Sequence, residues 1–144
     1  MSRLRSLRTC SKGATAIEFA VLAPVFLAFL LGLIEVSRVL WTTQVIQRAA
    51  HETARCFAIV AADCSDEDEA KQFAADIGRA SGVVIPTSAV SAAGGIACDG
   101  IEQNRVSITV PFRSVVPKML PLMPTEISSV ACFPKMWTDR SATG

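Results

Sequence analysis

The sequence is poor in charged residues, has one histidine and contains no tyrosine. Only 19% of its 144 residues are charged, against 51% that are hydrophobic, which argues against a disordered tail or a charged coiled coil. The 14 basic and 13 acidic residues nearly cancel, so the composition gives no support for a nucleic-acid-binding surface, which needs clustered lysine and arginine. At this length the chain forms one domain, or one domain with an anchor.

Known catalytic motifs are also missing. The sequence has no G-x-S-x-G nucleophile elbow, no phosphate-binding P-loop, no H-E-x-x-H zinc motif and no dinucleotide fingerprint. His51 is the single histidine, and Cys56, five residues further on, does not share its face of a helix. We therefore expect no catalytic residue and no cofactor, and we do not expect an enzyme.

The hydrophobic residues are concentrated near the amino terminus. Four basic residues and no acidic one precede Gly13, and residues 19–34 form an uncharged run of sixteen. With residues 14–17 added, the stretch reaches the ~20 residues that a helix needs to cross a bilayer. Basic residues before an apolar run predict a cytoplasmic amino terminus and export of the chain after the run. We expect a basic leader at 1–13 and a transmembrane helix at 14–36.

The processing of this segment has more than one interpretation. A cleaved secretory signal peptide is disfavoured, because residues 32–38 contain no good A-x-A-like cleavage site. An uncleaved signal anchor explains the charge and the run but gives Glu18 no role. An acidic side chain in the membrane interior costs roughly 2.5–3.5 kcal/mol on insertion scales, and such residues are usually functional.

A third interpretation gives Glu18 a role. Residues 13–19 (GATAIEF) resemble the processing site of type IV pilin-like proteins, in which a membrane prepilin peptidase cuts after the glycine. The resemblance implies cleavage between Gly13 and Ala14, with Glu18 as the fifth residue of the mature chain, followed by Phe19. The Glu18 carboxylate would neutralise the new α-ammonium group of its own or a neighbouring subunit, so that apolar helices pack into a filament core with paired charges.

A longer motif narrows the family. AIEFAVLAP at 16–24, followed by an apolar stretch and EVSR at 35–38, is similar to the amino-terminal signature of TadE-like proteins, minor pseudopilins of the tight-adherence (Tad/Flp) pilus machinery. The likeness covers residues 12–60 and includes Ala54-Arg55, where Thr53 replaces the glycine that often precedes this pair. TadF-like pseudopilins share the same front end.

The resemblance implies a minor pseudopilin that takes part in assembly or initiation of an adhesive pilus. It would be a single-pass protein of the bacterial inner membrane with a periplasmic head. Its partners would be prepilin peptidase, other pilins and minor pseudopilins, the Tad inner-membrane assembly platform and membrane lipid, with no nucleic acid. A signal-anchored periplasmic binding or envelope protein, and a minor pseudopilin of type II secretion, remain the alternatives.

The helix is expected to continue beyond the membrane. Apolar residues recur at spacings of three, four and seven after residue 38, and no proline or glycine occurs at 34–62. We therefore expect a helical stalk at 37–62. Within the membrane span, Pro24 predicts a kink, because proline removes one backbone hydrogen bond. Glu35 and Arg38 lie three residues apart and are expected to pair on the surface where the helix leaves the lipid.

Residues 63–144 are expected to form a small periplasmic head, beginning with a helix. Residues 65–69 (SDEDE) lack the spaced ligands of a calcium loop and are typical of a helix start. We expect Ser65 to cap this helix, Asp68 to stand near its third position and Gly82 to end it.

The rest of the head is expected to be extended. Alternating or β-favouring residues predict strands at 88–97, with a bulge or turn at Gly94-Gly95, at 105–113 and at 126–133. A shorter extended segment is expected at 83–85, turns at 99–100 and 103–104, and irregular chain at 115–124. Pro111 should lie at an edge or beside a bulge. The fold class expected is therefore α+β and pilin-like, with a long amino-terminal helix and a head of one further helix and a three-stranded antiparallel sheet.

The cysteines predict two disulfides. Cleavage after Gly13 would remove Cys10 with the leader and leave an even number of cysteines in an oxidising compartment: Cys56, Cys64, Cys98 and Cys132. A zinc site is disfavoured because no C-x-x-C pair is present, so we expect no metal. Of the three possible connectivities, we favour Cys56–Cys64 across the end of the long helix, with Cys98–Cys132 joining two strands.

Overall fold

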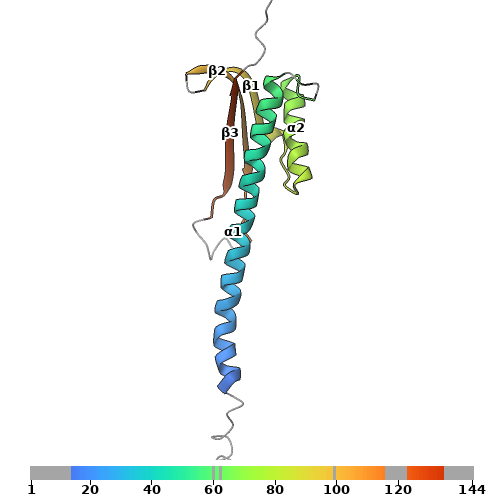
Figure 1. The fold of residues 1–144 in the computed structure, drawn as a ribbon. Helices are drawn as coiled ribbons and strands as arrows, with labels where there is room; N and C mark the ends of the chain where they lie inside the picture. The colour runs from blue at the N-terminus through green and yellow to red at the C-terminus, as the bar shows by residue number, and fades with distance from the viewer. Residues whose placement is uncertain (1–13, 60, 62, 99, 116–122, 135–144) are drawn as a thin grey trace, which may run out of the picture. The chain divides into compact units, whose positions relative to one another are not determined.

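The computed structural model describes residues 14–59, 61, 63–98, 100–115 and 123–134. The predicted leader, most of the expected irregular chain at 115–124 and the carboxyl-terminal tail lie outside these residues. The chain divides into two compact units, Met1–Ser37 and Arg38–Gly144, and helix α1 (Ala14–Ala58) contributes to both (Figure 1).

In the first unit the described chain is entirely helical. Residues 14–37 of α1 would span ~36 Å at ~1.5 Å per residue, more than the ~30 Å of a bilayer hydrocarbon core. Among the described residues, α1 is the one helix long enough and apolar enough to cross a membrane. Its hydrophobic side chains from Ile17 to Ile34 are almost all exposed, so this segment has no hydrophobic core of its own.

In the second unit α1 buries one side. Ile46, Ala49 and Ala50 have no exposed surface, whereas Gln47 and Arg48 on the opposite side are exposed. This three- and four-residue spacing is the one predicted for a stalk that packs against a head. Small alanine side chains on the buried side allow close approach of the other elements.

The helix ends earlier than expected, at Ala58 instead of residue 62. The backbone N–H of Ala61 donates to the Cys56 carbonyl at 3.3 Å, and that of Cys64 donates to the Ala61 carbonyl at 3.0 Å. The Cα atoms of Cys56 and Cys64 are 5.9 Å apart, whereas eight residues of helix would separate them by ~12 Å. The chain therefore turns back to close this disulfide.

Helix α2 (Glu67–Ala80) begins one residue later than expected. Asp66, not Ser65, is the N-cap, and its carboxylate accepts hydrogen bonds from the N–H groups of Asp68 and Glu69. Asp66 is favoured because its charge also complements the positive end of the helix dipole. The predicted stop at Gly82 is confirmed, since its φ is 74° and the N–H of Val83 donates to the Gly78 carbonyl at 2.9 Å, which closes a Schellman motif.

A short 3₁₀ turn (η3, Thr87–Ala89) leads into the sheet, which consists of β1 (Val90–Cys98), β2 (Ile101–Pro111) and β3 (Glu126–Pro134). The strands are antiparallel in the order β1-β2-β3, which confirms the predicted α+β class with one further helix and three strands. The pairing of β1 with β2 is irregular between Ala93 and Ile96, at the predicted glycine pair.

Three smaller expectations have mixed outcomes. Residues 83–85 do not form a strand, and the turn expected at 103–104 is wrong because both residues lie inside β2. The other expected turn, at 99–100, falls between β1 and β2, where Gly100 has a positive φ of 82° and residue 99 lies outside the described residues. Pro111 is the last residue of the central strand β2, where it pairs with Glu126 of β3. The pairing of β2 with β1 does not extend this far, because the first residue of β1, Val90, lies opposite Ile108. Pro111 therefore occupies a locally one-sided position, as a residue without a backbone N–H requires.

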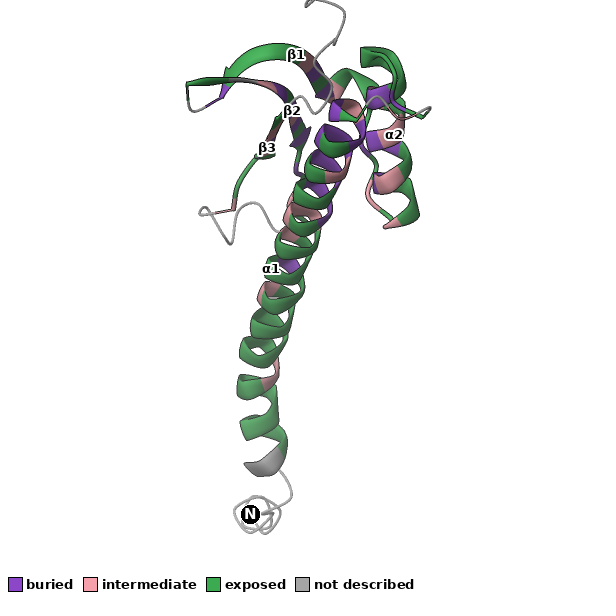
Figure 2. Cartoon of the chain, turned by 45° about the horizontal axis from the view of Figure 1, so that its top comes forward, coloured by how far each residue is buried: buried purple, intermediate pink, exposed green. Residues whose placement is uncertain are grey.

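The core of the second unit lies between one face of the sheet and the two helices. Alternate residues of β2 point inward, namely Val106, Ile108 and Val110, and they join the alanine-rich face of α1 and Ala70 and Ala74 of α2 in one cluster. Figure 2 shows the buried residues gathered on these facing surfaces. Because many of the helix residues are alanine, this core is small for its residue count.

Candidate assembly site

The predicted assembly residues lie at the start of α1. Glu18 and Phe19 are exposed, Phe19 to 73%. Gly13 lies outside the described residues, and Ala14 is the first residue of α1. Glu18 is therefore the fifth residue of the helix, about one turn from its first residue. A carboxylate at this position is close enough to interact with a charge at the helix amino terminus.

An apolar surface follows Glu18 on the same helix. Phe19, Leu22, Ala23 and Phe26 share one face by their spacing of three, four and seven residues. With the neighbouring side chains they line an open apolar groove, formed by Phe19, Leu22, Ala23, Val25, Phe26, Leu27 and Phe29. The two phenylalanines that begin and end this face remain 73% and 59% exposed. This face can bind lipid or an apolar helix and offers no polar group for a soluble ligand.

Pro24 lies inside α1, within this apolar surface. Proline has no N–H to donate, so the carbonyl of Ala20 has no partner four residues on. The expected kink at Pro24 remains a prediction.

The expected surface position of Glu35 is wrong, while its pairing with Arg38 remains a prediction. Glu35 is buried, with 2% of its surface exposed, and a buried carboxylate requires polar or charged partners to offset its desolvation. Arg38, the first residue of the second unit, places its guanidinium carbon 5.4 Å from the centroid of the Phe112 ring. This cation–π contact joins α1 to the end of the sheet.

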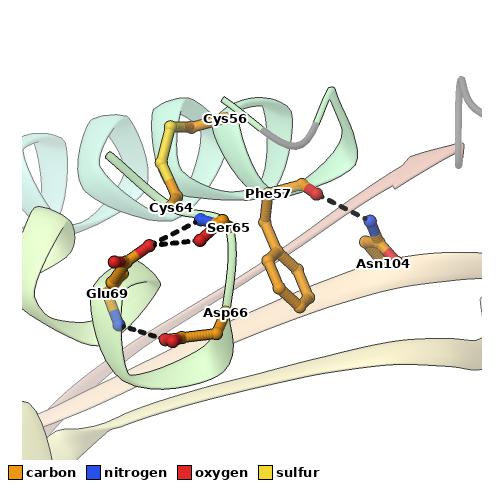
Figure 3. Close-up of a disulfide and its surroundings, with 7 residues drawn as sticks. All are labelled: Cys56, Phe57, Cys64, Ser65, Asp66, Glu69 and Asn104. Carbon is orange, nitrogen blue, oxygen red and sulfur yellow. Dashed lines mark hydrogen bonds between the residues drawn. A yellow bond between two sulfur atoms is a disulfide. The ribbon is translucent and has the colours of Figure 1, made fainter. Parts of the chain in front are cut away.

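The carboxyl end of α1 is fixed covalently. The disulfide between Cys56 and Cys64 is present, and the chain after it enters α2 through a set of polar contacts (Figure 3). The Glu69 carboxylate accepts from the Ser65 N–H at 2.9 Å and from its hydroxyl at 2.6 Å, while Asp66 caps from the other direction at 2.8 Å. These reciprocal contacts orient α2 directly after the disulfide.

Asn104 was not singled out by the sequence. It is 5% exposed, and its side-chain amide donates to the Phe57 carbonyl at 3.3 Å (Figure 3). A Cβ at Gly94 would lie 3.2 Å from its side-chain oxygen, so the glycine leaves room for it. A lone asparagine in an otherwise alternating strand is the sequence signal for such a residue, but asparagine also favours turns.

The second disulfide, between Cys98 and Cys132, is also present. It joins β1 to β3 across the central strand, and its Cα atoms are 6.4 Å apart. Two strand spacings in a flat sheet would give ~9.5 Å. The sheet therefore bends at this end, next to the irregular pairing at Gly94-Gly95.

The comparison with protein families bears on α1. Residues 13–55 match the model of the family described as TadE-like protein. Over this segment, the chain is similar to TadE-like proteins. The matched segment contains Glu18, Phe19 and Pro24 and stops three residues before the end of α1.

The TadE-like match leaves α2 and the sheet outside. No curated protein and no solved structure matches the chain significantly. In the described part of the head, no group of three histidine, cysteine or acidic side chains is placed to hold a metal ion.

Proposed function

We propose that the protein is a minor pseudopilin of a Tad pilus, cut by a prepilin peptidase between Gly13 and Ala14 and then anchored in the inner membrane by α1. Its head faces the periplasm, and the subunit contributes to assembly or initiation of the pilus by packing and recognition. The observation that carries the proposal is the TadE-like match at 13–55 over a helix whose apolar side chains are exposed.

The exposed apolar side chains of α1 explain why the helix would move from a lipid environment to contacts with other subunits. At roughly 25 cal/mol per Å² of apolar surface, side chains such as Phe19 and Phe26 are costly to expose to water. A bilayer and a filament of apolar helices both remove that cost. The proposed partners are therefore membrane lipid, other pilins and minor pseudopilins, and the Tad assembly platform in the inner membrane.

Glu18 would contribute to assembly through its charge. A carboxylate in an apolar surface is disfavoured unless a positive charge meets it. The α-ammonium group created by cleavage at Ala14, on the same or a neighbouring subunit, would be that charge. The two disulfides suit a head that functions after export, in an oxidising compartment.

Intact mass of the protein extracted from membranes tests the processing step. A mature chain that begins at Ala14 is expected in cells with the peptidase, and Gly13→Ala is expected to retain residues 1–13 while still inserting in the membrane. A chain that keeps Met1 in those cells contradicts the proposal.

A second experiment tests the role of the charge. Glu18→Ala is expected to spare membrane insertion and cleavage but to reduce pilus formation. Glu52→Ala is the matched control, since Glu52 is a partly exposed acidic residue of the same helix that pairs with Arg48 at 2.7 Å. Normal piliation with Glu18→Ala and Gly13→Ala would remove the basis of the mechanism.

A further inference from the structure

An apolar surface lies on the head beside the first turns of α1 in the second unit. Leu40 is 59% exposed, Trp41 60% and Val84 85%. Gly82, which follows α2 and precedes Val84 by two residues, is exposed as well. We refer to Leu40, Trp41, Gly82 and Val84 as the Trp41 surface.

The exposed side of α1 changes character directly after this surface. Leu40 is followed on the same side by Gln44, Gln47 and Arg48, all exposed. Positions four, seven and eight residues apart lie on one side of a helix. Leu33 and Val36, seven and four residues before Leu40, are also exposed, so the apolar exposure of this side of α1 continues through Leu40 and then gives way to polar side chains.

Trp41 can lie at a membrane boundary without leaving its polar atom unpaired. Its indole N–H donates to the Ser81 carbonyl at 3.2 Å, so its polar atom is satisfied within the protein. The rest of its large ring remains open to the surroundings. Tryptophan is enriched at the level of lipid head groups because the ring is apolar while the N–H needs a partner.

The same hydrogen bond brings the end of α2 to the level of Trp41. Gly82, with its positive φ of 74°, turns the chain so that Val84 projects, and residues 80–88 contain no charged side chain. The charged residue that directly precedes this loop in the sequence, Arg79, is exposed and pairs with Asp76 at 2.6 Å. This loop can approach lipid without burying an unpaired charge.

We propose that the Trp41 surface docks on the lipid bilayer, in the leaflet on the side of the head, with Val84 in the interfacial layer beside Trp41. The inference rests on the proposal that α1 spans the membrane, and it adds that the head itself rests on the lipid. The bilayer is the occupant because Leu40 and Trp41 follow the proposed membrane-spanning residues directly in the sequence of α1. A second protein subunit on this surface is an outcome of the test below.

The test measures quenching of single tryptophans by brominated lipids in proteoliposomes of the full chain. Trp137→Phe leaves Trp41 as the probe. Adding Trp41→Phe and Val84→Trp moves the probe to the loop, where an 85% exposed position accepts the larger ring. Phe26→Trp in the same tryptophan-free background reports the membrane span. Ile59→Trp reports a 51% exposed apolar position at the far end of α1.

Trp41 and the probe at Val84 are expected to be quenched more strongly by lipid brominated near the glycerol than by lipid brominated near the chain ends. The Phe26 probe is expected to show the reverse or equal quenching, and the Ile59 probe none. Quenching at Phe26 without quenching at Trp41 and Val84 overturns docking but leaves the anchor intact. A blue-shifted but unquenched signal at Val84 also overturns it, because protein then covers the surface. Absence of quenching at Phe26 refutes the anchor itself.

Discussion

The two parts of α1 solve the burial of apolar side chains in different ways. Before Arg38 the helix is apolar on nearly all sides and exposes residues such as Phe19. After Arg38 it buries one alanine-rich side against α2 and the sheet and shows polar residues on the other. The first part depends on an environment that the chain does not provide, whereas the second part carries its own core. One helix can therefore be disrupted in two separable ways.

The largest effect is expected from a carboxylate placed on each part. Phe26→Asp adds about 3 kcal/mol to the cost of membrane insertion, so the protein should be lost from carbonate-washed membranes. Ile46→Asp buries a charge at a position with no exposed surface, so the head should unfold while the protein stays in the membrane fraction. Ile59→Asp is the control and should change neither. Loss of membrane retention with Ile46→Asp would mean that the two parts are not independent.

The disulfides are expected to contribute next. In the chain-entropy account, the Cys98–Cys132 link, with 34 residues of separation, stabilises by about 4 kcal/mol, and the Cys56–Cys64 link, with 8, by about 2.5 kcal/mol. Serine pairs at each site should lower the Tm of the detergent-solubilised protein in that order. Membrane retention should not change in either variant, because neither link touches the membrane span. The opposite order of Tm would contradict the entropic explanation.

Loss of the Asn104 side chain is expected to cost about 1–3 kcal/mol. Asn104→Ala leaves the Phe57 carbonyl without its donor and opens a gap beside Gly94. Asn104→Asp removes the donor while keeping the size, and it should destabilise at least as much at neutral pH. Chemical denaturation in detergent measures both. A wild-type midpoint for Asn104→Ala would show that the contact is energetically neutral.

Substitution of Thr53 is expected to increase the stability of the head. It is fully buried on α1, and its hydroxyl has no hydrogen-bond partner among the described residues. Thr53→Val keeps the shape and removes the unsatisfied hydroxyl, so it should stabilise the head by about 1 kcal/mol. A lower Tm for this variant would reveal a partner for the hydroxyl.

The smallest effect is expected from the exposed pair of Asp68 and Lys71, 2.8 Å apart. The Lys71 ammonium, through a hydrogen bond and its charge, lowers the pKa of Asp68 from its ordinary 3.8, and Asp68 raises the pKa of Lys71 from its ordinary 10.5. The Asp68 contribution is thus present above about pH 4 and is lost as the pH falls through the lowered pKa. The Lys71 contribution is lost as the pH rises above about 10.5. Asp68→Asn should leave the Tm at pH 7 nearly unchanged, since exposed pairs are weak.

The sequence predicted the architecture where one local pattern decided it. The apolar run, the glycine stop at Gly82 and the alternating residues of β2 each follow from nearest-neighbour chemistry. Removal of Cys10 left four cysteines and three possible connectivities, and the favoured connectivity is the one that the structure contains. Errors arose where distant residues compete with local preference. Asp66 displaced Ser65 as the cap because Ser65 contacts Glu69, and Asn104 lies inside a strand because Phe57, 47 residues away, accepts its hydrogen bond.

In the candidate site, too, features set by a local sequence pattern were predictable and features set by distant contacts were not. The start of the helix and the apolar face after Glu18 were predictable, because they depend on sequence periodicity. Burial of Glu35 was not predictable, since three-residue spacing from Arg38 says nothing about what covers a side chain. The Trp41 surface was not predictable either, because it depends on a hydrogen bond between residues 40 positions apart.

The two disulfides also set how far the chain can be extended by a pulling force. In the proposed pilus subunit, tension would enter through α1, and Cys56–Cys64 would prevent the intervening loop from adding about 27 Å of contour length at ~3.4 Å per residue. Cys98–Cys132 would prevent the extension of about 115 Å of further contour length at ~3.4 Å per residue, and the segment that it closes includes all of β2. Between them, residues 65–97 remain free to lengthen. Force applied beyond Cys132 therefore meets a chain in which α2 and most of β1 form the extensible segment, while the β2 hairpin stays locked until a reductant acts.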